Sequence, residues 1–156
     1  VVAEIEQKTL SLTTRLNWIL SPTLSVELYA SPFVSSGEYS SFKQVREPLA
    51  TEFDERFKSY RNVVDNGDGT ESIDINDDSV YDVALDKPDF NFGQLRSTLV
   101  VRWEYRPGSV IYLAWQHGKE RSLNNGSFHS FNDIRDVFRQ DSDNTLLLKI
   151  NYWLSF

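Results

Sequence analysis

The sequence predicts an all-β fold, with about five strands of a larger antiparallel transmembrane β-barrel and long extracellular loops that hold a β-hairpin and one short helix. Three observations predict it. Five segments alternate apolar and polar residues, which is the period of a strand with two different faces. The connections between these segments are short and long in turn. No stretch reaches the ~18 apolar residues of a membrane helix.

The first two predicted strands, 9–20 and 23–33, each carry one apolar face. Their apolar positions include Leu12, Leu16, Trp18, Leu24, Val26 and Leu28. The opposite, polar faces hold Arg15 and Glu27. Ser21-Pro22-Thr23 leaves room only for a tight turn, so the two strands are expected to be antiparallel neighbours.

The third and fourth predicted strands, 93–105 and 109–116, repeat the pattern. Their apolar positions include Leu95, Leu99, Val101, Trp103, Tyr105, Ile111, Leu113 and Trp115. Arg106-Pro107-Gly108 forms the second tight connection, in which proline presets φ and glycine supplies a positive φ.

The fifth predicted strand, 145–156, shows the alternation best. Its apolar face consists of Leu146, Leu148, Ile150, Tyr152, Leu154 and Phe156. Three of the opposite positions, Lys149, Asn151 and Ser155, are polar, which a buried helix would not place at this spacing. A terminal aromatic residue preceded by apolar residues at alternate positions resembles the recognition signal of the barrel-assembly machinery. That signal would consist of Ile150, Tyr152, Leu154 and Phe156; the alternative is an ordinary last strand.

Two long connections, 35–92 and 118–144, complete the predicted order short, long, short, long, end. In an outer-membrane barrel this order places the short turns and the C-terminus on the periplasmic side. The first connection is expected to contain a hairpin between Tyr60–Val64 and Thr70–Ile75 with glycines at its turn. The second is expected to contain a helix over Phe131–Gln140, which either packs on the barrel rim or docks a partner.

The two faces of the sheet predict different surroundings. Aromatic residues near the tight turns and the C-terminus are expected to form an interfacial girdle: Trp18, Trp103, Tyr105 and Tyr152. Charged residues on the polar face are expected to line the lumen, as an ion-paired network or as a channel: Arg15, Glu27, Arg96, Arg102, Glu104 and Lys149. A soluble barrel with the leucine face inside remains an alternative, because alternation alone does not distinguish the two.

Five strands do not close a barrel, and single-chain bacterial barrels have an even number of strands. The chain contains no methionine and opens on the alternating stretch Val1-Val2-Ala3-Glu4-Ile5. We therefore expect residues 1–156 to be the C-terminal part of one barrel domain, with the remaining strands of the same protein before Val1.

The net charge of −7 is concentrated between Thr51 and Pro88, which hold eleven acidic and four basic residues. No basic patch is present, so a nucleic-acid partner is not expected. The segment Asp65-Asn66-Gly67-Asp68-Gly69 fits neither register of an EF-hand calcium loop. Weak divalent-cation binding by the wider acidic cluster remains open, through Asp74, Asp77, Asp78 and Asp82.

Catalysis is not expected in this segment. The only two histidines, His117 and His129, lie apart in the sequence and no Gly-x-Ser-x-Gly element accompanies them. With no cysteine in the chain, a thiolate metal site is impossible, and no cofactor is expected. His117 shares the parity of Trp115 and is expected at the outer rim of its strand.

Several motifs resemble a known family. They are Pro88-Asp89-Phe90-Asn91-Phe92, Val101-Arg102-Trp103-Glu104-Tyr105-Arg106-Pro107-Gly108-Ser109, Leu113-Ala114-Trp115-Gln116 and the ending Asp143–Phe156. They are similar to the C-terminal barrel-like domain of unknown function in Gram-negative surface proteins with a carbohydrate-binding-module family 9-like domain ahead of it. The resemblance implies an outer-membrane location and a role linked to surface carbohydrate, and it brings no catalytic residues.

The sequence is compatible with three functions. The first is a structural one, in which the segment completes a barrel that anchors an N-terminal sugar-binding or catalytic domain. Its expected partners are outer-membrane lipid, the preceding strands, the barrel-assembly machinery and a surface protein or glycan at the outer loops. The second is a pore with a charged lumen, and the third is a soluble antiparallel barrel that acts as a binding module.

Overall fold

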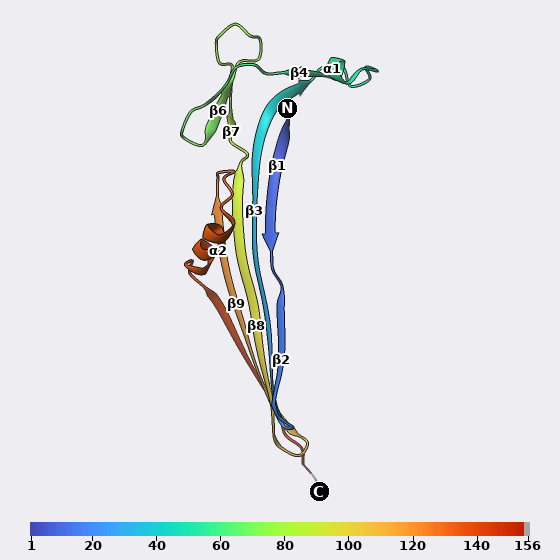
Figure 1. The fold of residues 1–156 in the computed structure, drawn as a ribbon, viewed down its shortest axis with the longest axis vertical. Helices are drawn as coiled ribbons and strands as arrows, with labels where there is room; N and C mark the ends of the chain where they lie inside the picture. The colour runs from blue at the N-terminus through green and yellow to red at the C-terminus, as the bar shows by residue number, and fades with distance from the viewer. Residues whose placement is uncertain (155–156) are drawn as a thin grey trace. The chain divides into compact units, whose positions relative to one another are not determined.

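The computed structural model describes residues 1–154 and shows a mostly antiparallel β protein with two short helices (Figure 1). The strands are β1 (Val2–Ser11), β2 (Thr14–Ser21), β3 (Leu24–Val45), β4 (Phe57–Ser59), β5 (Val63–Asp65), β6 (Thr70–Ile73), β7 (Val83–Asp86), β8 (Phe90–Arg106), β9 (Ser109–Leu123) and β10 (Asp143–Asn151). The helices are α1 (Phe53–Arg56) and α2 (Ser130–Phe138). None of the described helices is long and apolar enough to cross a membrane. The expected all-β class is confirmed.

A seven-stranded sheet has the order β1-β3-β8-β9-β10, with β2 and β4 also paired to β3, and a separate three-stranded sheet has the order β5-β6-β7. The chain forms two compact units. Unit 1 comprises residues 1–8, 35–91 and 123–128; unit 2 comprises residues 9–34, 92–122 and 129–156.

In unit 2 the registers of the sheet place apolar residues opposite one another. On the hairpin of β2 and β3, Leu16 lies opposite Leu28 and Trp18 opposite Val26. Since directly opposite residues share a face, the apolar positions of neighbouring strands combine into one surface. The alternation expected from the sequence therefore places the apolar residues of this hairpin on one face of the sheet.

The edge pair of β9 and β10 follows the same rule. Leu146 lies opposite Trp115, and the next two positions on this face pair leucine with leucine and isoleucine with isoleucine. Turns at 22–23 and 107–108 connect the hairpins, and Gly108 takes the expected positive φ, of 76°. Both turns lie at the same end of unit 2 as the end of β10, where Asn151 is opposite Val110 (Figure 1).

The helix α2 packs on the sheet of unit 2 through one side. Val137 and Asp133 are buried. Asp133 accepts hydrogen bonds from the backbone N–H of His129, at 2.7 Å, and from the Arg121 guanidinium, at 3.0 Å. The expected helix over Phe131–Gln140 is confirmed with bounds shifted by one or two residues.

Unit 1 contains the predicted hairpin. β5 and β6 pair with Val63 opposite Ile73 and Asp65 opposite Glu71, and Gly67 and Gly69 in the turn have positive φ values of 75° and 89°. A third strand, β7, pairs with β6 and was not expected from the sequence. This strand, Val83–Asp86, has only four residues and follows an aspartate-rich stretch, so the sequence shows no clear alternation of apolar and polar residues there.

Several strands differ in length from the sequence-based bounds. β3 continues to Val45 and β9 to Leu123, whereas strand ends were expected near residues 33 and 116. Beyond those points the polar and small residues no longer alternate with apolar ones, so the pattern stops before the backbone pairing does. β10 ends at Asn151, and Phe156 lies outside the described residues.

Candidate functional site

The apolar face of unit 2 is the most unusual surface of the chain, because its side chains are exposed. Trp18 is 59% exposed, Leu146 is 68% exposed and Leu148 is 57% exposed. Leu16 and Ile150 are exposed as well. Contiguous apolar surface of this kind marks a site that contacts lipid or another protein.

The residues expected to form a girdle lie on this face near the tight turns. The rings of Trp103 and Tyr105 are tilted against each other with centroids 6.1 Å apart. The Tyr152 hydroxyl accepts a hydrogen bond from Arg106 Nη1 at 3.1 Å. Trp103 and Tyr105 thus contact each other, and Tyr152 has a polar partner in Arg106.

A second aromatic cluster, which was not expected from the sequence, lies on the same face farther along β9. Asn144 Oδ1 accepts a hydrogen bond from Trp115 Nε1 at 3.0 Å and lies 2.9 Å from His117 Nδ1. Asn144 is directly opposite His117 in the register. The parity that His117 shares with Trp115 is the signal that pointed to this face; the pairing with Asn144 required the register.

The polar face brings some of the expected lumen charges together and leaves others apart. Arg102 Nη2 lies 3.4 Å from Glu104 Oε2. Arg96 instead approaches Glu120, at 3.8 Å. Glu27 lies opposite Asn17 in the register.

Two basic residues of this face lie over aromatic rings. The Arg15 guanidinium is 5.7 Å from the centroid of Tyr29, and Lys149 Nζ is 6.0 Å from the centroid of Tyr112. Within the part of the chain that the structure describes, the charged face therefore consists of separate ion pairs and cation–π contacts.

A polar hollow of about 390 Å³ lies on this face where β8, β9 and β10 meet. Its lining includes Tyr29, Gln94, Arg96, Gln116, Glu120 and Thr145. Gln94 Nε2 donates a hydrogen bond to Glu120, which also lies beside Arg96. Side chains of both charges and several amides thus surround a space large enough for a small polar solute.

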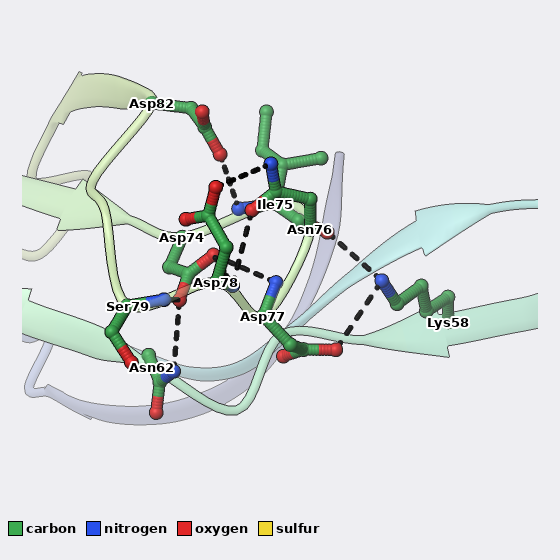
Figure 2. Close-up of polar contacts among 9 residues, drawn as sticks. All are labelled: Lys58, Asn62, Asp74, Ile75, Asn76, Asp77, Asp78, Ser79 and Asp82. Carbon is green, nitrogen blue, oxygen red and sulfur yellow. Dashed lines mark hydrogen bonds and ion pairs between the residues drawn. The ribbon is translucent and has the colours of Figure 1, made fainter.

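The acidic cluster of unit 1 is organised around Asp74 (Figure 2). This side chain is fully buried and its two oxygens receive hydrogen bonds from the backbone N–H groups of Asp77, Asp78 and Ser79 and from Asn62 Nδ2, at 2.8, 3.3, 2.9 and 2.9 Å. The Asn62 amide and these backbone N–H groups hold the pKa of Asp74 below its usual value.

Two residues of this loop have left-handed backbone conformations, Asp77 with φ 63° and Ser79 with φ 70°. Side chains disfavour this region, so the loop needs compensating contacts. Because the N–H groups of these same residues bond to Asp74, the carboxylate stabilises the turn directly.

The other acidic residues of the cluster each contact a different nitrogen group. Asp82 Oδ2 accepts from the Ile75 N–H at 2.9 Å, Asp78 Oδ1 from the Val80 N–H at 2.8 Å, and Asp77 Oδ2 lies 3.4 Å from Lys58 Nζ. Among residues 1–154, no group of three or more histidine, cysteine or acidic side chains is arranged to hold a metal ion. The cluster organises a loop through its own hydrogen bonds.

The residues expected to form the barrel-assembly signal lie at the end of β10 and directly after it. Ile150 lies in β10 and is exposed, and Tyr152 and Leu154 follow the strand and are exposed too. Trp153, which separates them, donates its backbone N–H to Ser109 Oγ at 3.0 Å. The terminal segment thus bonds to the start of β9 through its backbone, while the side chains of Tyr152, Trp153 and Leu154 are all exposed.

Comparison with known proteins gives one match. No curated protein and no solved structure matches the chain. A family model described as a domain of unknown function (DUF5916) matches residues 1–156, which is the whole sequence. The chain belongs to the DUF5916 family.

Proposed function

We propose that this chain forms part of the wall of a β-barrel in the bacterial outer membrane, with a structural and anchoring role. The exposed apolar face of unit 2 carries the proposal. Burial of a side chain the size of Leu146 or Leu148 contributes about 1.5–3 kcal/mol of stabilising free energy, which is lost where the side chain is exposed to water. Contact with lipid hydrocarbon restores this contribution. The polar face would then line the lumen.

The sheet edges support the same proposal. β10 is the last strand in the sheet order and offers one unpaired edge to its surroundings. Backbone groups without partners are prohibitively costly in lipid, so a membrane-spanning sheet closes on itself. We therefore expect β10 to pair with a further strand of the complete barrel. An association with surface carbohydrate rests on the sequence resemblance alone.

Membrane fractionation of the complete protein tests the proposal. We expect it in the outer-membrane fraction, extracted by detergent and not by high salt or carbonate. A monodisperse, detergent-free monomer would contradict the proposal and favour the soluble binding module, because such a protein must bury the leucine face internally.

A pore is the second candidate function, and the polar hollow beside Arg96 and Glu120 favours it. Conductance measured in planar bilayers separates the two functions. A silent barrel supports the anchoring role, whereas steady ion-selective conductance supports the pore. Arg96→Gln and Glu120→Gln would then shift ion selectivity in opposite directions, because they remove charges of opposite sign from the same wall.

A further inference from the structure

The helix α2 lies on the apolar face of the sheet. Adding a Cβ atom to Gly93 would bring it into collision with Val137 Cγ2 of the helix and within 3.7 Å of Val34 Cγ1. Side chains of a strand point to its two faces in turn, so Gly93 shares a face with Leu95 and Leu99 of β8. The helix therefore continues this surface, beside β8 and β9 in Figure 1.

The same face of β9 changes character from the tight turn toward α2. Its successive residues are Ile111, Leu113, Trp115, His117, Lys119 and Arg121. Apolar side chains come first, then the aromatic cluster with Asn144, then two cations that hold the helix. Lys119 Nζ donates to the backbone oxygen of Phe138 at 2.7 Å, and Arg121 Nη2 lies 3.0 Å from Asp133 Oδ1. This is the sequence of environments along a membrane normal, from hydrocarbon through the interface to the headgroups.

The outer side of α2 combines two phenylalanines with two arginines. Phe131 is 84% exposed and Phe138 is 50% exposed, although both lie on a helix that buries Val137 against the sheet. At 100° per residue, Arg135 and Arg139 project next to the two rings on the outward arc. Arg139 Nη1 is 3.7 Å from Asp136 Oδ1, and the Arg139 side chain is still 68% exposed. An apolar edge beside a basic edge is typical of helices that lie in a membrane interface.

We propose that α2 is an interfacial helix that binds the outer-leaflet lipid around the barrel. Phe131 and Phe138 insert between lipid molecules, and Arg135 and Arg139 bind their phosphate groups. The helix occupies the headgroup layer just beyond Trp115 and His117, where continuity with the apolar face brings lipid to it. The proposal rests on the proposed membrane position of the sheet and adds a lipid-binding site to it.

Site-specific fluorescence quenching tests the proposal on the complete protein reconstituted in vesicles. This chain contains no cysteine, so single cysteines introduced into it can carry an environment-sensitive dye. The test positions are Phe131→Cys and Phe138→Cys. Leu148→Cys reports on the apolar face of the sheet, and Lys149→Cys, its neighbour on the polar face, is the matched control. The quenchers are lipids spin-labelled at the headgroup or deep in the acyl chain.

Each pattern of quenching decides one of the two proposals. We expect headgroup-labelled lipid to quench positions 131 and 138 severalfold more than position 149, and chain-labelled lipid to quench position 148. Quenching at 148 without quenching at 131 and 138 overturns the interfacial helix and leaves the membrane barrel standing. No quenching at 148 overturns the barrel itself.

A second experiment tests the role of Arg135 and Arg139 in binding phosphate. In vesicles of phosphatidylglycerol and phosphatidylcholine, quenching at position 138 should rise severalfold with the anionic fraction and fall with salt. The double variant Arg135→Gln/Arg139→Gln should lose most of this dependence. The pair Asn132→Gln/Gln140→Asn, in α2 and directly after its C-cap, changes no charge and should keep it. A response that is independent of lipid charge in the unmodified helix overturns phosphate binding.

Discussion

The Asp74 loop of unit 1 and the apolar face of unit 2 differ in whether their groups find partners within the chain. The loop is self-contained: the buried carboxylate satisfies backbone groups that the left-handed residues Asp77 and Ser79 present to it. The apolar face is not, since leucines of β2 and β10 pair across strands and still remain exposed. The first region is satisfied by groups of its own chain, whereas the second, in the proposed barrel, would be stabilised by the surrounding lipid.

A charge on the apolar face should produce the largest effect. We expect Leu148→Arg to destabilise the barrel in lipid vesicles by about 2–4 kcal/mol, because arginine must be held near the middle of the hydrocarbon. Urea unfolding followed by tryptophan fluorescence measures it. The adjacent change Lys149→Arg, on the polar face, serves as control and should leave the midpoint almost unchanged. Equal effects at both positions would remove the distinction between the two faces.

Changes in the contact between α2 and the sheet should produce the second-largest loss of stability. Gly93→Ala introduces a methyl group where Val137 Cγ2 already lies, so the helix must shift, at a cost of about 1–3 kcal/mol. Val137→Ala alone removes two buried methyl groups and should cost about 1.5 kcal/mol. Combined, the two changes should cost less than their sum, because the shorter side chain makes room for the new methyl. Strict additivity in a double-mutant cycle would show that the helix does not pack on Gly93.

The sequence predicted most of the long strands because period-two alternation is a local property. It placed one strand over residues 9–20, however, where the structure has the end of β1 and then β2. The tight turn predicted that the hairpin strands are antiparallel neighbours, whereas pairs such as Leu16 with Leu28 required the structure. Gly67 and Gly69 identified the hairpin turn. The continuation of β3 and β9 was not predicted, since strand pairing there depends on neighbours distant in sequence.

The roles within the candidate sites were harder to predict than the strands. Asp74 was grouped with Asp77, Asp78 and Asp82 as a weak cation site, and only the loop conformation shows that its oxygens serve backbone donors. The helix was predicted from its apolar stripe, but the face on which it packs depends on Gly93, a residue without a side chain. Such contacts become visible only when the register is known.

The self-contained loop should respond to acid. The depressed pKa of Asp74 means that its contribution is complete above the unfolded value of about 3.9 and is lost as the pH falls through the lower folded pKa. We expect protection of the Asp77 and Ser79 amides from hydrogen exchange to fall on the order of tenfold once Asp74 is protonated. Asp74→Asn should show reduced protection already at neutral pH and little further change in acid.

The effect of Asp74 should stay local if the comparison holds. The amides of Ile111 and Leu113 in unit 2 provide the reference, and we expect their protection factors to remain constant across the same titration. A parallel loss in β9 would show that the loop supports the whole chain, and the loop would then no longer be self-contained.

The smallest effect should come from the polar face, where Lys149 Nζ lies over the Tyr112 ring. In a water-filled lumen this contact is hydrated, so Lys149→Gln should cost about 0.5–1 kcal/mol in vesicle unfolding. In a plugged, dry lumen the same cation–π contact is desolvated, and the loss should rise to about 2 kcal/mol or more. Tyr112→Leu, alone and in combination, isolates the interaction from the loss of the charge itself. A coupling near zero would mean that this face is as open to water as a loop tip, which argues against any closed barrel around it.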